Sequence, residues 1–299
     1  MQSCLLEAHA KVNFYLEICG QRPDGFHTVR MILQSIALSD TIHLRPHSSG
    51  ILIRCDHPQV PLDATNLAYR AAQLLQVNYG IHRGIEIEIH KRIPVAAGLA
   101  GGSANAAAVL VGLNQIWGLG LTQGELATVG AQLGSDVPFC IAGGTQLAQG
   151  RGEKLEPLPS LDGIPILLAK PKDLGISTAW AYRTYHDFER AVRDETGLPE
   201  LIRGIESHDT CQIAQHLSND LEGPVLAHHP LIAQLKQSQG QAGALGSLMS
   251  GSGSTVFGLW ESVAAATSAL PSLVAAYPTV DFWVTTTAPS GITLELDEH

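Results

Sequence analysis

The chain has 299 residues with 18 basic and 28 acidic side chains, so its formal net charge is −10. This balance excludes the dense basic surface that nucleic acids and anionic membranes require. No segment has the roughly 20 consecutive apolar residues of a membrane span, and the first seven residues lack the pattern of a signal peptide. The five cysteines form no CxxC pair. We therefore expect a globular cytoplasmic protein with free thiols.

Length and proline content together predict two domains. A domain usually takes about 150 residues, so this length suggests two of them. The segment 156–165 contains three prolines and a glycine near the middle of the chain. Because such a segment interrupts helices and strands, we place the boundary there and expect domains over residues 1–157 and 158–299.

The first half of the chain is predicted to contain strands and helices in mixed order. Gly84–His90 alternates apolar and polar residues, as a half-buried strand does. A turn at Ser39 and Asp40 is expected to join two strands, and a capping-box pattern at Thr122–Glu125 is expected to open a helix that ends at Gly134. The other predicted elements are strands over Ala8–Ile18, Met31–Ile36 and Thr41–Arg45, and helices over Asn66–Gln76 and Ser103–Trp117.

The second half mixes strands and helices without a steady β–α–β rhythm. This order favours two α+β domains over one doubly wound sheet. The predicted strands are Ile164–Ala169, Thr255–Trp260 and Val280–Thr285, and the predicted helices are Ser177–Arg193, Asp209–Leu217, His229–Ser238 and Val263–Ala276.

The strongest functional signal is a loop of small residues between a predicted strand and the helix that begins at Ser103. Glycines allow tight turns and close backbone approach, and the free amides and dipole at a helix N-terminus attract phosphate. A plain strand-to-helix turn would need fewer small residues. The chain has neither GxxxxGK[ST] nor GxGxxG, so this is not the usual P-loop or dinucleotide fingerprint. The expected nucleotide contacts are Pro94, Val95, Ala96, Ala97, Gly98, Leu99, Ala100, Gly101, Gly102, Ser103 and Ala104.

A second glycine cluster, Met249–Phe257, leads directly into a predicted strand. Alone it is equally compatible with a hairpin or a bulge. Together with the first loop it could close over the same phosphates through Gly251, Ser252 and Gly253.

Asp136 precedes Pro138, where a helix could begin. Capping of that helix explains the position by itself and is the interpretation that the local sequence favours. The alternative is a carboxylate that orients or deprotonates an accepting hydroxyl group. Lys11 and Asn13 share one face of the first strand. A strand lysine is usually solvated, but opposite a carboxylate and a triphosphate it would neutralise charge.

The segment Arg22–His27 contains the turn sequence Pro-Asp-Gly, followed by Phe26 and His27. An aromatic ring beside a histidine can stack on a base and hydrogen-bond to its edge. The alternative is a core phenylalanine and a surface histidine. The remaining histidines, including His186 and the adjacent pair at 228 and 229, form no set with the spacing of metal ligands.

Taken together, these segments resemble the GHMP small-molecule kinases. Within that family they are similar to the branch whose substrate is a cytidine-diphosphate-linked branched alcohol of the non-mevalonate isoprenoid pathway. The resemblance runs from about residue 8 to about residue 285. The motifs that carry it are Lys11-x-Asn13, Arg22–His27, Asp63–Leu67, Pro94–Ala107, Gly134–Phe139 and Met249–Phe257.

The resemblance implies a two-domain fold, with an N-terminal domain like domain 2 of ribosomal protein S5, a ferredoxin-like C-terminal domain and the site between them. It implies Asp136 as the catalytic aspartate with Lys11 as its partner. It further implies Asn66 and Lys91 beside the nucleotide. For the substrate it implies Asn13 as a contact residue. It also implies that Phe26 and Tyr182 stack on the two sides of the cytosine and that His27 lies at the cytosine edge. ATP and Mg²⁺ are the implied cofactors, and the expected state is a monomer or weak homodimer.

Two residues depart from the family pattern. Ala104 stands where the family often has a serine, and Phe26 stands where a tyrosine is usual. The alternatives are a homoserine-type or mevalonate-type kinase, a decarboxylase or a non-catalytic nucleotide-binding protein on the same fold. A nicotinamide-dependent oxidoreductase is disfavoured by the absent fingerprint.

Overall fold

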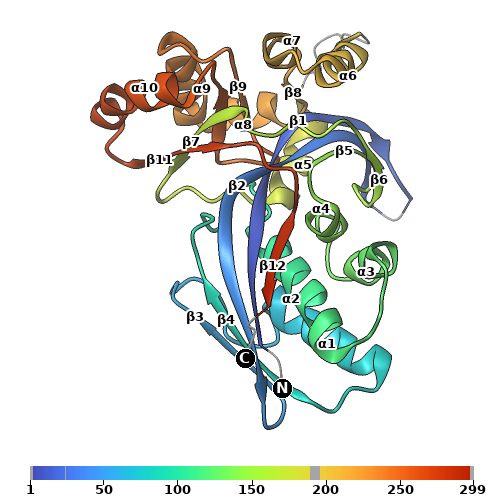
Figure 1. Cartoon of the computed structure of the whole chain (residues 1–299). Helices are drawn as coiled ribbons and strands as arrows, with labels where there is room; N and C mark the ends of the chain where they lie inside the picture. Colours follow the sequence, from blue (N-terminus) through green and yellow to red (C-terminus); the bar gives the residue numbers. More distant parts are fainter. Residues whose placement is uncertain (1–2, 24, 189–195, 297–299) are drawn as a thin grey trace.

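Two long antiparallel strands, β1 (Cys4–Gln21) and β2 (His27–His47), organise the larger of two sheets. The computed structural model describes residues 3–23, 25–188 and 196–296. Figure 1 shows these two strands running the length of the molecule. The sheet has eight strands in the order β12-β1-β2-β4-β3, with β5 and β8 attached to β2 and β1 and β6 attached to β5. The other strands are β3 (Ile51–Cys55), β4 (Gly84–His90), β5 (Thr145–Gly150), β6 (Lys154–Pro157), β8 (Ser218–Asn219) and β12 (Ile292–Leu296).

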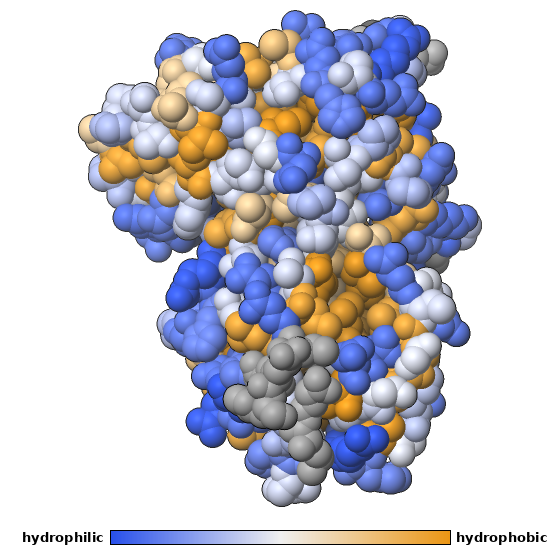
Figure 2. Space-filling model, in the orientation of Figure 1, coloured by the Kyte–Doolittle hydropathy of each residue, from blue (hydrophilic) through white to orange (hydrophobic). Residues whose placement is uncertain are grey.

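The second sheet has four antiparallel strands in the order β11-β7-β10-β9. These are β7 (Pro165–Pro171), β9 (Gly246–Met249), β10 (Val256–Leu259) and β11 (Val280–Thr286). Two helices, α9 (Pro230–Gln241) and α10 (Val263–Ala276), pack against this sheet. A small cluster of buried apolar residues joins α10 to the sheet, with Leu167 and Trp260 at its centre. Figure 2 shows apolar surface in the region of α10, where Val263 and Val274 are about half exposed.

Helix α2 (Gly101–Trp117) lies against the larger sheet, and the loop of small residues 94–100 precedes its N-terminal end. Its alanines let the helix approach the strands closely. Gly112 has the same effect, because a β-carbon there would lie 2.6 Å from Leu44 Cδ1. The helix packs with α1 (Leu67–Tyr79), α3 (Gln123–Gly130) and α4 (Val137–Ala142).

Most of the predicted elements are confirmed, with shifted ends. The predicted helix Val263–Ala276 and strand Gly84–His90 match α10 and β4. The capping box of α3 is present, but the helix ends at Gly130 rather than Gly134. The remaining helices are α5 (Thr178–Asp187), α6 (Gly197–Ser207), α7 (Thr210–Gln215) and α8 (Glu222–His228). The predicted helix Ser177–Arg193 thus corresponds to α5, and its last residues lie outside the described part of the chain.

The predicted turn at Ser39 and Asp40 is wrong, because β2 continues through both residues. Instead of a turn, β2 has a β-bulge at this point. His9 pairs with Ser39 and the next residue, Ala10, pairs with Ile36, so two residues of β2 bulge out. Asp40 is fully buried and accepts hydrogen bonds from the backbone amides of the segment that follows β4. Of this polar pair, only Asp40 faces buried partners, while Ser39 Oγ donates to the exposed Glu7.

The two sheets are not divided by a single point in the chain. The predicted boundary after residue 157 falls between β6 of the larger sheet and β7 of the smaller one. However, β12 returns to pair with β1, and Figure 1 shows this red strand beside the blue one. The segment 158–299 therefore does not correspond to one sheet, because its last strand, β12, belongs to the larger sheet. No helix in the described part of the chain is long and apolar enough to span a membrane.

Candidate active site

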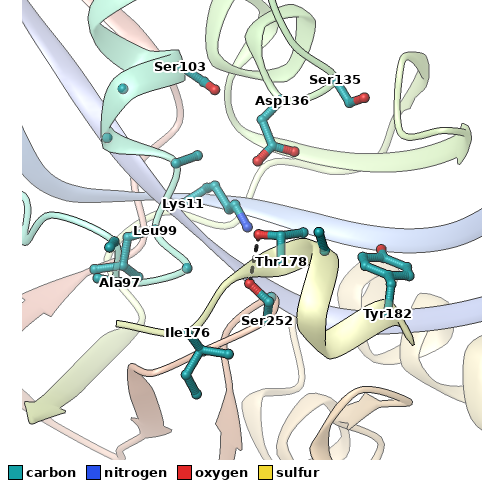
Figure 3. Close-up of a pocket in the computed structure, with 18 of the residues that line it drawn as sticks. Lys11, Ala97, Leu99, Ser103, Ser135, Asp136, Ile176, Thr178, Tyr182 and Ser252 are labelled. Carbon is teal, nitrogen blue, oxygen red and sulfur yellow. Dashed lines mark hydrogen bonds between the residues drawn. The ribbon is translucent and has the colours of Figure 1, made fainter. Parts of the chain in front are cut away.

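A cavity of about 910 Å³ is lined by residues from both halves of the chain. It is lined by nearly every residue that the sequence singles out, and Figure 3 shows part of this lining. The exception is Ala104, which does not reach the cavity. Ala104 is fully buried, and its amide donates to the Ala100 carbonyl within the helix. The predicted residues at the cavity are Lys11, Asn13, Phe26, His27, Asn66, Lys91, Pro94, Val95, Ala96, Ala97, Gly98, Leu99, Ala100, Gly101, Gly102, Ser103, Asp136, Tyr182, Gly251, Ser252 and Gly253.

The loop between β4 and α2 has a left-handed backbone at three positions: Ala96 (φ 52°), Gly98 (φ 77°) and Ala100 (φ 57°). This conformation costs a non-glycine residue about 1 kcal/mol, so the loop stores strain at the two alanines. Ala100 is the N-cap of α2, and no side chain caps the helix. The first amides of α2 therefore lack the usual side-chain acceptor, as an anion site requires.

The second glycine cluster holds the first loop in place. Ser250 Oγ donates to the Gly98 carbonyl oxygen at 3.0 Å, and the Thr255 amide donates to the Ala97 carbonyl oxygen at 3.2 Å. A β-carbon on Gly98 would lie 2.3 Å from the Ser250 carbonyl oxygen. The hairpin or bulge interpretation of the second cluster is therefore incomplete, since the cluster also braces the phosphate loop.

Lys11 lies in the middle of β1 with 4% of its surface exposed. Its Nζ donates to Asn13 Oδ1 at 2.7 Å, and its backbone amide donates to the Leu99 carbonyl oxygen at 3.2 Å. A β-carbon on Gly251 would lie 3.3 Å from Lys11 Nζ. The ammonium group is thus enclosed by both glycine clusters and is directed into the cavity.

Asp136 occupies the N-cap position of α4, but its side chain makes no capping hydrogen bond. The capping interpretation, which the local sequence favours, is therefore wrong. Figure 3 shows the carboxylate of Asp136, the hydroxyl of Ser103 and the ammonium of Lys11 projecting toward the same space. Within the described part of the chain, neither Lys11 nor Asp136 forms an ion pair, so both charges are available to a ligand. Cys140 beneath them stays protonated, because burial and then Asp136 raise the pKa of its thiol.

Lys91 is directed to the N-terminal end of α2 by a buried carboxylate that the sequence did not identify. Its Nζ hydrogen-bonds to Asp40, which also accepts from Asn105 Nδ2 at 2.8 Å. A β-carbon on Gly101 would lie 3.1 Å from Lys91 Nζ, so the ammonium adjoins the first residue of the helix. Polar and apolar residues alternate only over 41–44, and 39–41 are three polar residues in a row, so local periodicity gives no signal that Asp40 lies within a strand.

Asn66 is held by two hydrogen bonds at the edge of the cavity. Its Oδ1 accepts from the Ala68 amide at 2.8 Å as the N-cap of α1, and its Nδ2 donates to the Pro61 carbonyl oxygen at 2.8 Å. Its position at the cavity wall is therefore fixed by the helix that it caps.

Phe26 and Tyr182, the two aromatic residues that are predicted to stack on a base, lie at another part of the cavity. Each of them contacts another side chain of this chain. Phe26 is 53% exposed, and the Arg151 guanidinium lies 5.2 Å from its ring centroid. The His27 ring stacks on Tyr182 with centroids 4.9 Å apart. The sequence did not identify Arg151, which lies in the turn between β5 and β6 and lines the cavity.

His27 also meets a second histidine, with 2.6 Å between its Nε2 and that of His186. Burial, and then the nearby His186, lower the pKa of His27. Burial also raises the pKa of the Tyr182 hydroxyl, and Asp136 and Asp220 add to that shift. Both groups are therefore neutral near pH 7, so this region presents neutral rings with polar edges.

Comparison with known proteins identifies the family. Residues 66–144 match the GHMP kinases N terminal domain, and residues 201–278 match GHMP kinases C terminal. A 4-diphosphocytidyl-2-C-methyl-D-erythritol kinase of Synechococcus sp. (strain JA-3-3Ab) is 58% identical over 302 residues, covering 99% of this chain and 98% of that protein. A protein of the same name from Gloeobacter violaceus is 50% identical over 303 residues, covering 100% and 99% of the two chains.

Solved structures agree with this relationship. A crystal structure of a 4-(cytidine 5'-diphospho)-2C-methyl-D-erythritol kinase has a TM-score of 0.79 at 32% identity, covering 95% of this chain and 99% of that one. A homoserine kinase from Cytophaga hutchinsonii has a TM-score of 0.78 at 23% identity, covering 98% and 97% of the two chains, and supports the fold alone.

The α+β fold and the loop-lined cavity are those of a small-molecule kinase. The chain belongs to the GHMP kinases, in the family of the 4-diphosphocytidyl-2-C-methyl-D-erythritol kinases. It is thus an ATP-dependent enzyme that phosphorylates a small molecule.

Proposed function

We propose that this protein transfers the γ-phosphoryl group of ATP to the 2-hydroxyl group of 4-diphosphocytidyl-2-C-methyl-D-erythritol, giving the 2-phosphate and ADP. The full-length similarity to kinases with that substrate in their name supports the assignment. The observation that carries it is a single cavity with an uncapped helix N-terminus, an unpaired aspartate and lysine, and a group of aromatic rings.

We assign the phosphoryl transfer to Asp136 and Lys11. A new bond forms between the substrate oxygen and the γ-phosphorus, while the bond from that phosphorus to the β,γ-bridging oxygen of ATP breaks. Asp136 accepts a hydrogen bond from the 2-hydroxyl group and takes its proton as the oxygen attacks. Lys11 keeps Asp136 ionised and offsets negative charge on the transferring group. Its buried position supports this role, because a fixed charge acts more strongly where water is excluded.

We assign ATP to the loop 94–103, with Lys91 and Asn66 on the nucleotide side. The free amides of α2 and the ammonium of Lys91 beside Gly101 support a position for the phosphates there. Gly251, Ser252 and Gly253 line the cavity between Ser250 and Thr255, the two residues that hold this loop, and we place them beside the acceptor. Ser252 Oγ is itself held by Thr178 Oγ1 at 3.0 Å (Figure 3).

We assign the cytosine ring to the aromatic region of the cavity, with Phe26 and Tyr182 stacking on it, His27 at its edge and Asn13 contacting the substrate. Because Arg151 now contacts Phe26 and His27 now stacks on Tyr182, the incoming base must displace these contacts. Arg151 and His27 are then free to meet the diphosphate and the base edge.

Mg²⁺ is the expected cofactor, and the side chains present fit it. Within the described residues no three His, Cys, Asp or Glu side chains form a metal site. Mg²⁺ in kinases is instead held by one or two protein oxygens together with phosphates and water. A β-carbon on Gly134 would lie 3.9 Å from Ser103 Oγ, which places this hydroxyl beside the segment that carries Asp136. Ser103 would hold the ion together with phosphate oxygens and water, and the ion would neutralise charge on the β- and γ-phosphates.

We further propose that the protein works in the cytoplasm as a monomer or weak homodimer. Its five free cysteines support a reducing compartment.

A direct assay tests the proposed function. The protein is incubated with Mg–ATP and one of four acceptors at a time. These are 4-diphosphocytidyl-2-C-methyl-D-erythritol, 2-C-methyl-D-erythritol 4-phosphate, homoserine and mevalonate. ADP release is measured, and the product is identified by ³¹P NMR. We expect turnover with the cytidine-bearing alcohol alone. Equal use of the methylerythritol phosphate would contradict a cytosine subsite, and turnover of homoserine or mevalonate alone would replace the proposed substrate.

A further inference from the structure

A second, smaller cavity of about 220 Å³ lies on the far side of the segment that follows β4. Lys91, Pro94 and Val95 border both cavities, so this segment forms a wall between them. The second cavity also contacts β7 and β11 of the smaller sheet, and none of the roles proposed above uses it.

The main feature of this cavity is Lys170 on β7, which is 5% exposed. Its Nζ donates to the Pro171 carbonyl oxygen at 2.6 Å. Within the described part of the chain no carboxylate pairs with it, and Asp281 and Asp173 act on it only from a distance. Burial accordingly lowers the pKa of Lys170. A buried ammonium without a counter-charge is costly, so an anion in the cavity would relieve this cost.

Two more cations line the same cavity. Lys172 is about half exposed and lies 3.7 Å from Asp281, and the Arg92 side chain is 65% exposed. Arg92 Nη1 donates to the Lys91 carbonyl oxygen at 2.7 Å and lies 3.5 Å from Asp56 Oδ2. Among the residues that line the cavity Asp281 is the one carboxylate, against three cations besides Lys91, which Asp40 already binds. Such an excess of positive charge is unusual in a chain of net charge −10.

We propose that this cavity is a second anion site, in which Lys170, Arg92 and Lys172 hold a small phosphate or diphosphate group. Arg92 supplies a planar fork of donors and the lysines supply point charges, a combination that suits phosphate oxygens. Trp283 and His57 provide flat walls beside these cations. The site shares Lys91, Pro94 and Val95 with the wall of the main cavity, but its three cations do not line that cavity and it does not depend on the substrate of the enzyme.

Calorimetric titration with pyrophosphate tests this site while the phosphate loop is blocked. The protein is first saturated with Mg²⁺, a non-hydrolysable ATP analogue and the cytidine substrate, so that the phosphate and diphosphate positions of the main cavity are all occupied. We expect one equivalent of pyrophosphate to bind. Lys170→Met and Arg92→Gln should each weaken this binding by about tenfold or more, because each removes a charge-assisted hydrogen bond. Arg54→Gln is the matched control, since Arg54 pairs with Glu86 outside both cavities and should change nothing.

The alternative outcomes are distinct. No binding with the loop blocked, or equal binding by wild type and both variants, would overturn the proposal. Circular dichroism shows whether Lys170→Met folds. If it does not, the proposal is tested by Arg92→Gln, which changes an exposed side chain. Titrations with inorganic phosphate and with glycerol 3-phosphate, in place of pyrophosphate, rank the anions and identify whether the group is free phosphate, a phosphomonoester or a diphosphate.

Discussion

The α-carbon of Gly98 faces the carbonyl oxygen of Ser250 so closely that a β-carbon on Gly98 would lie 2.3 Å from that oxygen. The two residues are 152 positions apart, and Ser250 Oγ donates back to the Gly98 carbonyl oxygen. The two glycine clusters therefore form one unit: the second cluster supports the first, which is assigned to the triphosphate.

Gly98→Ala should damage this unit. The added methyl group clashes with backbone atoms, and the positive φ of 77° adds about 1 kcal/mol. We expect the KM for ATP to rise by about tenfold or more and the free energy of unfolding to fall. Gly118→Ala is the control, because Gly118 also has a positive φ but no atom within 4 Å of an added β-carbon. If the two variants have the same KM for ATP, the contact with Ser250 does not shape the site.

Asp136→Asn should remove turnover without destabilising the fold. Loss of a positioned base typically lowers kcat by about 100-fold to 10,000-fold, and Asp136 makes no capping hydrogen bond whose loss would reduce stability. Steady-state kinetics and thermal melting measure the two effects. Thr122→Ala is the control with the opposite expected result, because Thr122 caps α3. Its loss should lower the free energy of unfolding by about 1 kcal/mol and leave kcat unchanged. Wild-type kcat in Asp136→Asn would remove Asp136 from the mechanism.

Phe26→Ala should weaken binding of the cytidine substrate. Stacking of a base on an aromatic ring contributes about 1–3 kcal/mol, so KM for that substrate should rise roughly 5-fold to 150-fold, while KM for ATP stays unchanged. Stability should barely change because the ring is 53% exposed. Tyr79→Ala is the matched control, as Tyr79 is 40% exposed and outside both cavities. An unchanged substrate KM in Phe26→Ala would place the base elsewhere.

The His27–His186 pair should make stability depend on pH. Burial and His186 lower the pKa of His27, so between about pH 6.5 and that lowered pKa the unfolded chain binds more protons than the folded one. The stabilisation that comes from keeping His27 neutral in the folded protein is therefore complete above about pH 6.5. It is lost as the pH falls through this window. We expect denaturant unfolding at several pH values to show this decline.

His186→Phe isolates the contribution of the second histidine. Removing His186 should raise the pKa of His27 in an NMR titration and flatten the decline in stability, although burial keeps part of the shift. The same titration curve in wild type and variant would show that His186 does not act on His27.

Several features of this protein follow from the sequence because they depend on neighbouring residues. The alternation in Gly84–His90 and the capping box at Thr122 are local patterns, and β4 and the start of α3 match them. The loop of small residues before α2 is equally local, because it needs only glycines and alanines followed by a helix. The family resemblance rested on such short motifs and proved sufficient to identify the class of enzyme.

Other features were decided only by the tertiary structure, because they join residues that are far apart in the chain. The local sequence could not show that Asp40 is buried under Lys91, or that Asp136 leaves its helix uncapped. Nor could it show that β12 returns to β1, since strand pairing depends on the packing of the whole sheet. The contact of Arg151 with Phe26 also depends on which surfaces the fold brings together. The same is true of Lys170, which is buried and has no carboxylate paired with it in the described part of the chain. Hydrophobic periodicity predicts neither feature.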